Sequence, residues 1–305
     1  MTRLVADDLL ADLNVPFERD VPLGPCTWYG VGGHAEVLAM PSSIAQLGEL
    51  VNRCHGGNIP LRVLGSGANL LVADEGVPGV VVQLSDPAFA TIEREGTRLR
   101  AGAGVDLFKL VLDTAKAGLA GLEVLAGIPA SVGGAVRMNA GGAYGDVGSS
   151  VGRVQVMAPS GQVYYRDRDD LVFSYRNSNI VAPLILDVEF DLAEDDPDAL
   201  MKRVKEIFFY KKNSQPMSAA SAGCAFKNPP AEAADGASAG KLIDQAGLKG
   251  FRVGGAHVSD VHANFIAADK GAATAGDIMA VLDHVQRTVA ERFGVELERE
   301  VVAWP

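Results

Sequence analysis

The chain has 305 residues, of which 48% are hydrophobic and 21% are charged, and its formal net charge is −11. This size and composition are typical of a globular protein with two or three domains. The acidic balance argues against nucleic acid or an anionic membrane as the main partner, because both require a basic face. No apolar run is long enough for a transmembrane helix, and the acidic first residues are unlike a signal peptide.

The cysteines indicate a reduced, cytoplasmic protein. Cys26, Cys54 and Cys224 are odd in number, far apart and in no CxxC pair. Because structural zinc sites and disulfide frameworks need closely spaced or paired cysteines, we expect neither, and we predict no metal site.

The predicted elements of the first 192 residues are short helices and strands. Residues 2–14 read as an amphipathic helix, and residues 26–41 as a hairpin or a strand leading into a helix. That helix begins after Ser42 or Ser43 and stops at Gly56 and Gly57. Residues 60–84 read as three strands separated by turns, and the alternation continues to about residue 192. The pattern predicts an α+β fold, with sheet pieces joined by glycine turns.

The last third of the chain reads as a separate domain. An acidic linker precedes a helix whose apolar positions are Leu200, Val204, Ile207 and Phe208, and Ser214–Pro216 break it. After a loop come a helix at 238–247, strands around 251–259 and 262–268, and a helix over about 275–293. We therefore predict domains at 1–85, 86–209 and 210–295, with the strand-like segment 296–305 returning to the second domain.

Two glycine-rich segments suggest a dinucleotide. In the first, a strand delivers the turn Gly65, Ser66, Gly67, Ala68 and Asn69. Such a turn either exposes main-chain N–H groups to a phosphate or forms a plain tight hairpin; it is neither a Walker A loop nor a Rossmann fingerprint. The second, residues 120–145, is almost uncharged, so it can lie against a large planar ligand or form a buried helix contact.

Three further segments carry candidate polar groups. Arg176, in FSYRNSNI, is either a surface charge or a fork of donors for a carboxylate. Cys224 lies in SAGCAFKNPP, close to a lysine and an asparagine. LEREV near the C-terminus holds Glu298 and Glu300, and we interpret Glu298 as a surface residue.

These motifs together resemble the UDP-N-acetylenolpyruvoylglucosamine reductase family. GSGANLLVAD, AGIPASVGGAVRMNAGGAYG, YRNS, QPMSAASAGCAFKNP, SAGKLIDQAGLKG, GGAHVSDVHANFI and LEREV occur in that family's order and spacing, from about residue 24 to 303. The resemblance implies a two-part FAD-binding region of the vanillyl-alcohol-oxidase type, at 1–85 and 86–209, and a smaller α+β substrate-binding domain at 210–295. It also implies the compact form of the enzyme, which we expect to be a monomer without nucleic-acid or membrane partners.

The resemblance assigns the binding residues. It places Gly65, Ser66, Gly67, Ala68 and Asn69 at the FAD diphosphate. Along the flavin it places Gly127, Ile128, Pro129, Ser131, Val132, Gly133 and Asn139. Lys212, Lys227 and Asn228 match substrate-side positions, and Tyr210, Gln215 and His262 are weaker matches.

The resemblance also implies the chemistry. NADPH reduces the flavin, which then passes a hydride to the β-carbon of the enolpyruvyl group of UDP-N-acetylglucosamine enolpyruvate. Arg176 and Glu300 match the residues that flank the substrate carboxylate and stabilise the enolate. Glu300 would have to be protonated, which requires a raised pKa.

Cys224 is the clearest departure from the family pattern. It stands where most members have a serine that delivers a proton to the α-carbon. A thiol is more acidic than a hydroxyl, so Cys224 can take this role, or it can be a buried spacer with water as the donor. Two other hypotheses remain: a different FAD oxidoreductase on the same scaffold, and a non-catalytic nucleotide-binding regulator.

Overall fold

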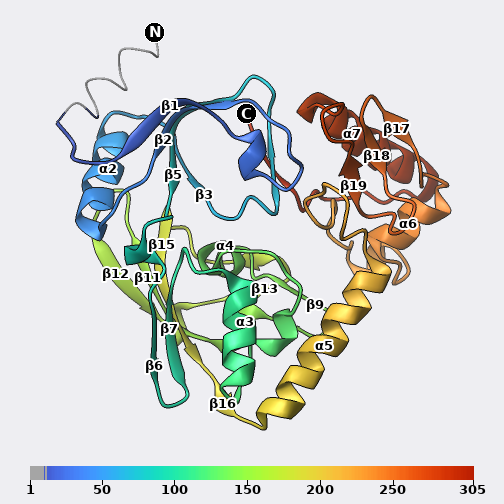
Figure 1. The fold of residues 1–305 in the computed structure, drawn as a ribbon. Coiled ribbons are helices and arrows are strands. Elements are labelled where there is room, and N and C mark those ends of the chain that lie inside the picture. The colour runs from blue at the N-terminus through green and yellow to red at the C-terminus, as the bar shows by residue number, and fades with distance from the viewer. Residues whose placement is uncertain (1–9, 11) are drawn as a thin grey trace. The chain divides into compact units, whose positions relative to one another are not determined.

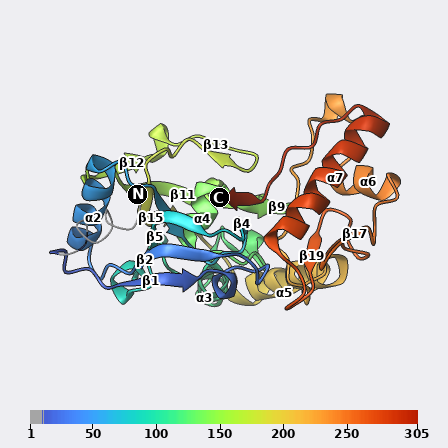
Figure 2. The ribbon, with the colours of Figure 1, turned by 90° about the horizontal axis from the view of Figure 1, so that it is seen from above.

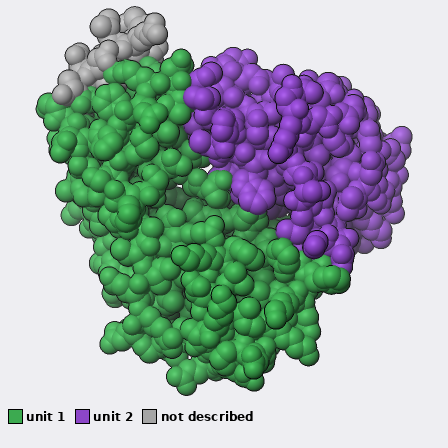
Figure 3. All heavy atoms as spheres, in the orientation of Figure 1, with its two compact units in different colours: residues 1–21, 35–66, 78–209 green, residues 22–34, 67–77, 210–305 purple. Residues whose placement is uncertain are grey.

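The computed structural model describes residue 10 and residues 12–305, and the chain forms two compact units (Figure 3). Unit 1 takes the residues up to 21, 35–66 and 78–209. Unit 2 takes residues 22–34, 67–77 and 210–305. The predicted helix at 2–14 falls mostly outside the described residues. The two units are described separately below.

Unit 1 contains a four-stranded sheet that is covered by one helix. The strands, in the order in which they lie side by side, are β1 (Phe17–Pro22), β2 (His34–Ala39), β5 (Val77–Gln83) and β3 (Leu61–Leu64). The helix α2 (Ile44–Gly56) begins where the Ser43 hydroxyl accepts the Gln46 N–H and ends at Gly57. Its buried residues, Leu47, Leu50, Val51 and Cys54, follow the helical repeat and form one core stripe. The predicted helix is confirmed.

The second sheet of unit 1 is antiparallel and five-stranded. Its order is β12 (Val163–Asp167), β11 (Val151–Met157), β15 (Leu184–Asp191), β7 (Arg98–Gly102) and β6 (Ile92–Glu95). Val154, Val188 and Ala101 lie opposite one another in neighbouring strands and are fully buried. The next residues, Arg153, Glu189 and Arg100, point to the other face, which is charged. The alternation follows from the two-residue period of a strand.

The rest of unit 1 supplies helices and short paired strands (Figure 1). The helices are α3 (Leu107–Lys116), α4 (Val132–Arg137) and α5 (Pro197–Ser214), whose last residues belong to unit 2. Leu200, Val204 and Ile207 of α5 are buried, as the sequence pattern predicts. The paired two-residue strands are β8 (Leu119–Ala120) with β16 (Ala193–Glu194), β9 (Gly141–Gly142) with β10 (Gly145–Asp146), and β13 (Phe173–Ser174) with β14 (Asn177–Ser178).

Unit 2 has its own core around a three-stranded sheet and two helices. The sheet consists of β17 (Arg252–Val253), β18 (Ala256–Val258) and β19 (Ile266–Ala268), and the helices are α6 (Ala239–Gln245) and α7 (Ala275–Phe293). Ile278, Val281, Leu282, Val285 and Val289 of α7 are buried at helical spacing. These elements were predicted. Figure 1 shows α6, α7, β17, β18 and β19 together, and Figure 2 shows α6 and α7 from above. The mixed content of both units confirms the α+β class.

The C-terminal strand does not pair where the sequence suggested. β20 (Val302–Trp304) pairs in parallel with β4 (Leu70–Val72), not with a strand of residues 86–209. Its predecessor, residues 295–301, is extended but is not a regular strand. The expected return to the second domain is therefore wrong. Within the part of the chain that is described, no helix combines the length and apolarity needed to span a bilayer.

Candidate functional site

The turn Gly65–Asn69 is not a hairpin. The strand before it, β3, pairs in parallel with β5 in unit 1, whereas the strand after it, β4, pairs with β20 in unit 2. A hairpin would pair its two strands with each other, so that interpretation is wrong. The turn is the crossing between two sheets, and the division between the units falls after Ser66.

The two glycine-rich segments meet inside unit 1. A Cβ built on Gly65 would stand 2.6 Å from the Ser131 Oγ, so any side chain at this position would collide with the second segment. Gly65 and Ser66 are exposed, and Gly127, Ile128 and Pro129 are half-buried. Residues 124–136 carry no charge. Accessible main chain without charged side chains can lie close to a large planar ring and can offer N–H groups to a diphosphate, and both features fit an FAD.

Not every glycine in these segments is explained by a ligand. A Cβ on Gly133 would lie 2.8 Å from the Ala103 Cβ, and a Cβ on Gly67 would lie 2.0 Å from the Cys26 carbonyl oxygen. Gly67 also has a φ of +65°. The N–H groups of Val132 and Gly133 donate to the carbonyls of Val105 and Ala103. Protein packing alone therefore requires glycine at 133 and 67.

Arg176 stands at the tip of the β13–β14 hairpin. Its φ is +55°, in the left-handed region that disfavours residues with a Cβ. Its Nη1 donates to the Gly141 carbonyl at 2.8 Å, and its guanidinium carbon lies 5.3 Å from the centre of the Tyr175 ring. The strained backbone and these two contacts hold a half-buried guanidinium at the tip of a short turn. Backbone strain of this kind is often found at functional positions.

Asn139, predicted to line the flavin, is only 2% exposed. Its Oδ1 accepts the Gly148 N–H at 2.9 Å, and its Nδ2 donates to the Ser174 carbonyl at 3.0 Å. The amide is thus bonded to the protein main chain on both sides.

In unit 2, Cys224 begins an extended segment that is held on both sides. On one side Cys224 is bridged to Phe265 and the Ala225 N–H donates to the Asn264 carbonyl at 2.8 Å. On the other side the Glu300 N–H donates to the Ala225 carbonyl at 2.8 Å, and Phe226 is bridged to Arg299. This pairing brings Cys224 and Glu300, 76 positions apart in the numbering, onto adjacent extended segments.

Asn264 holds this arrangement, and the sequence analysis missed it. Its side chain is 3% exposed, its Oδ1 accepts the Phe226 N–H at 3.0 Å, and its Nδ2 donates to the Phe226 carbonyl at 2.8 Å. The amide thereby replaces a β-strand neighbour. The available signal was an asparagine inside the apolar run HANFIAA, because a buried amide needs main-chain partners.

Glu300 is fixed through its neighbours. The Asn69 Nδ2 donates to the Glu300 carbonyl at 3.0 Å. Arg299 points to α7, where its Nε donates to the Gln286 Oε1 at 2.8 Å and its Nη2 pairs with Asp283. Asn69, predicted at the cofactor diphosphate, therefore also positions the main chain of Glu300.

The predicted substrate-side residues differ in their surroundings. The Lys227 Nζ pairs with the Glu298 Oε1 at 2.6 Å, so Glu298 is not an isolated surface residue. The Asn228 Oδ1 accepts the Ala239 N–H at the start of α6 at 3.0 Å. Lys212 is exposed near the end of α5, whereas its neighbour Lys211 is buried.

The weaker candidates also have definite places. Tyr210 is 55% exposed on α5, and Gln215 is half-buried after that helix. The His262 Nδ1 accepts the Asn264 N–H at 3.2 Å, and burial lowers the pKa of this imidazole. His262 is thus next to the residue that holds the Cys224 segment.

None of the three cysteines forms a disulfide bond. Cys224 and Cys26 are half-buried, whereas Cys54 is buried in α2, and burial raises the pKa of its thiol to about 11. Within the described residues, no group of three or more His, Cys, Asp or Glu side chains is arranged to hold a metal ion.

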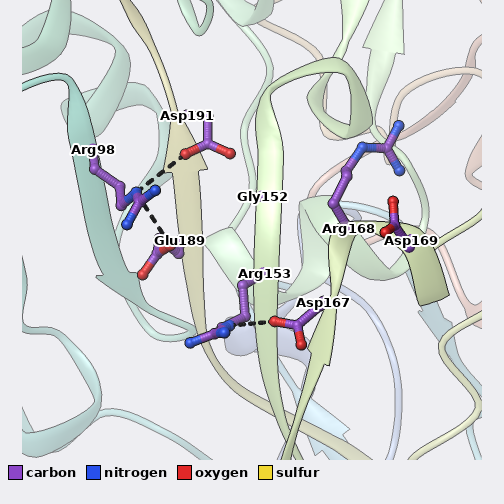
Figure 4. Close-up of a pocket in the computed structure, with 8 residues that line it drawn as sticks. All are labelled: Arg98, Gly152, Arg153, Asp167, Arg168, Asp169, Glu189 and Asp191. Carbon is purple, nitrogen blue, oxygen red and sulfur yellow. Dashed lines mark hydrogen bonds and ion pairs between the residues drawn. The ribbon is translucent and has the colours of Figure 1, made fainter.

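A separate surface cavity of about 310 Å³ lies on the charged face of the five-stranded sheet (Figure 4). It is lined by Arg98, Gly152, Arg153, Asp167, Arg168, Asp169, Glu189 and Asp191. The Arg98 Nε lies 3.5 Å from the Glu189 Oε1 and 3.4 Å from the Asp191 Oδ1. The Arg153 Nε lies 2.5 Å from the Asp167 Oδ1. Its three arginines are outnumbered by four carboxylates, and no predicted site residue lines it, so we do not assign it to the functional site.

Two family models match this chain, and together they cover most of it. Residues 35–165 match the FAD binding domain model, and this range includes both glycine-rich segments. The chain is therefore a protein with an FAD-binding domain. Residues 215–304, which include Cys224, Asn264 and Glu300, match the model described as the C-terminal domain of UDP-N-acetylenolpyruvoylglucosamine reductase.

Whole-chain relatives establish the family. A UDP-N-acetylenolpyruvoylglucosamine reductase of Desulfosudis oleivorans is 45% identical over 92% of both chains, and one of Moorella thermoacetica is 38% identical over 98% of this chain and 97% of its own. The crystal structure of the enzyme (MurB) from Thermus caldophilus superposes with a TM-score of 0.80, at 39% identity over 96% of this chain and 99% of that one. The chain belongs to the UDP-N-acetylenolpyruvoylglucosamine reductase family.

Proposed function

We propose that this chain is an FAD-dependent enzyme that uses NADPH to reduce the enolpyruvyl group of UDP-N-acetylglucosamine enolpyruvate, giving UDP-N-acetylmuramate for peptidoglycan synthesis. The observation that carries the proposal is the paired arrangement in unit 2. One extended segment begins at Cys224 and continues to Lys227, and the adjacent segment presents Glu300. A proton donor, a cation and a carboxyl group are the groups that this reaction requires beside the cofactor.

The residues present fit the cofactor. We assign the diphosphate to the turn Gly65, Ser66, Gly67, Ala68 and Asn69, and the flavin to the surface of Gly127, Ile128, Pro129, Ser131, Val132 and Gly133. The close approach of Gly65 to Ser131 supports this assignment, because it places the start of the turn against the flavin segment within unit 1. When bound, FAD supplies hydride transfer from NADPH to the β-carbon of the substrate.

Arg176 and Glu300 stabilise the negative charge that develops over the α-carbon and the carboxylate. The Arg176 guanidinium donates charge-assisted hydrogen bonds to the substrate carboxylate, and the contact with Gly141 keeps it aimed. Glu300 helps only as the protonated acid, since a carboxylate would repel the enolate.

Cys224 delivers the proton to the α-carbon. Its thiol is half-buried and stands on a segment that is bonded on both sides, so its position is well defined. A thiol in its protonated form can serve as a general acid.

Lys212, Lys227 and Asn228 lie on the substrate side. Lys227 provides a cation for the substrate diphosphate or carboxylate. Before the substrate binds, the Lys227 ammonium group is ion-paired with Glu298. Asn228 also maintains the start of α6 through its contact with Ala239.

We further propose that the protein works as a cytoplasmic monomer, since none of its three cysteines is in a disulfide bond and the roles above draw on residues of one chain. A single mass near 31.9 kDa in size-exclusion chromatography with light scattering is expected. A larger mass at micromolar concentration would contradict the monomer alone.

Stopped-flow measurement of the two half-reactions tests the function. The purified protein should carry FAD, NADPH should bleach it, and the enolpyruvyl UDP-sugar should restore its absorbance. Bound FAD without reoxidation by this substrate would overturn the proposal and would favour a different FAD oxidoreductase. Protein without FAD would favour a nucleotide-binding regulator.

A further inference from the structure

The hairpin that presents Arg176 is bonded to the glycine-rich segment at three alternate positions. The Ser178 Oγ donates to the Arg137 carbonyl at 2.8 Å, the Asn139 Nδ2 donates to the Ser174 carbonyl at 3.0 Å, and the Arg176 Nη1 donates to the Gly141 carbonyl at 2.8 Å. Residues 137–141 are thus a template for residues 174–178. Both segments belong to unit 1, so these contacts lie within one compact body.

Asn139 is the central member of this template. Its φ is +47°, and asparagine tolerates this left-handed conformation better than most residues with a Cβ. Its short amide, 2% exposed, reaches Gly148 on one side and the hairpin on the other. Gly148 must approach closely, since a Cβ there would stand 2.4 Å from the Phe173 ring and 2.8 Å from the Asn139 Oδ1. The conformation, the burial and the partners all require asparagine.

We infer that Asn139 is a positioning residue for Arg176 and not a flavin ligand. Its amide sets the main chain at Ser174, two residues before the guanidinium-bearing residue. Only Tyr175 lies between Ser174 and Arg176. A shift of the main chain at Ser174 therefore moves the Arg176 guanidinium directly. This inference rests on the proposed function, because the role of Arg176 toward a carboxylate does.

Two variants of Asn139 separate its bonds. Asn139→Gly keeps the left-handed backbone without strain and loses both bonds. Asn139→Asp keeps the acceptor for Gly148 but turns an acceptor toward the Ser174 carbonyl. The matched control is Asn179→Asp, because the Asn179 Oδ1 accepts the Val172 N–H at 3.1 Å and its Nδ2 donates to the Asp170 carbonyl at 2.9 Å. That control makes the same chemical change at the base of the same hairpin.

The measurement is ligand discrimination by the FAD-loaded protein. The dissociation constant is measured from the flavin spectrum for the enolpyruvyl UDP-sugar and for the UDP-N-acetylglucosamine that lacks the carboxylate. Asn139→Asp and Asn139→Gly should each weaken the carboxylate-bearing ligand about tenfold, as expected for a misplaced charge-assisted hydrogen bond, and leave the other ligand unchanged. Asn179→Asp should change neither value, and Asn139→Gly combined with Arg176→Ala should discriminate no worse than Arg176→Ala alone.

Several results would overturn the inference. Equal weakening of both ligands, or the same loss in Asn179→Asp, would mean a general loss of structure. A loss of bound FAD, or a further loss in the Arg176→Ala background, would mean that Asn139 acts on the cofactor or the substrate directly. If Asn139→Gly does not fold, Asn139→Asp decides alone, because it keeps one of the two bonds. A wild-type protein that does not turn over the substrate would contradict the proposed function instead.

Discussion

The two units hold their reactive side chains in opposite ways. In unit 1, Arg176 sits at the tip of a two-strand hairpin with a left-handed φ, and side-chain bonds to the glycine-rich segment fix the hairpin. In unit 2, Cys224 and Glu300 sit on extended segments whose main chains bond to each other, with Asn264 completing the pairing. The turn positions the Arg176 guanidinium at the cost of a strained backbone. The paired segments position the side chains of Cys224 and Glu300 without such strain.

The difference predicts how substitutions act. In unit 1, a substitution that relieves the backbone strain at Arg176 should stabilise the protein and should also remove activity. In unit 2, substitution of a reactive side chain should change the reaction rate and leave the free energy of unfolding almost unchanged. The groups that stabilise unit 2 should lie on residues that do not touch the substrate. The following predictions test this contrast, beginning with the largest effect.

Cys224→Ala should slow reoxidation of the reduced flavin by substrate by roughly 10²–10⁴, the usual contribution of a general acid. Reduction by NADPH and the melting temperature should barely change, because the pairing of the segment uses main-chain groups. Stopped-flow absorbance separates the two rates. Cys224→Ser is the matched control and should retain most of the activity. Unchanged reoxidation in the alanine variant would leave Cys224 as a spacer.

Arg176→Gly and Arg176→Ala should both lose roughly 10²–10³ in the substrate half-reaction, as expected when a group that stabilises a developing anion is removed. Their stabilities should differ, since glycine relieves the left-handed strain and alanine retains it. The glycine variant should be more stable to urea by about 1 kcal/mol. Equal stabilities would contradict the strained turn and remove the contrast with unit 2.

Glu300→Ala should slow the substrate half-reaction more than Glu300→Gln, by about tenfold, because glutamine retains a hydrogen-bond donor. Equal losses in the two variants would argue against a protonated glutamate.

Asn264→Ala should destabilise the protein by about 3 kcal/mol, since it leaves the buried Phe226 N–H and carbonyl without partners. Urea unfolding measures this value. Asn228→Ala, which removes the acceptor of the Ala239 N–H at the start of α6, should cost about 1 kcal/mol. Similar losses in both would mean that the amide of Asn264 does not complete the pairing.

Glu298→Gln should have the smallest effect. It releases Lys227 from an ion pair whose acidic partner is 72% exposed, and such pairs contribute little to stability. The KM for the UDP-sugar should fall a few-fold while kcat is unchanged, because the substrate no longer competes with the carboxylate. An increased KM would instead assign Glu298 a direct role in binding.

A thiol titration gives an internal check on these variants. At pH 8 a thiol reagent should modify Cys26 and Cys224, whereas Cys54 should react only on unfolding, because it is buried and its pKa is raised to about 11. The Cys224 variants should each lose one fast-reacting thiol.

Local patterns in the sequence predicted most helices. The N-cap at Ser43, the buried stripe of α2 and the long helix α7 follow from capping chemistry and helical spacing, which act over a few residues. Cys224, Arg176 and Glu300 were also identified, through motifs whose order and spacing resemble one family. The pairing partners were not predicted, because a glycine turn looks the same in sequence whether it closes a hairpin or crosses between sheets.

By itself, then, the sequence determined the class of fold, the family and which side chains could react. Only the tertiary structure decided that β4 pairs with β20, that Asn69 bonds to the main chain of Glu300, and that the amides of Asn139 and Asn264 face the protein main chain. The physical reason is that an asparagine amide can serve a ligand or a main-chain group equally well. Burial and the position of residues far away in the chain select between the two.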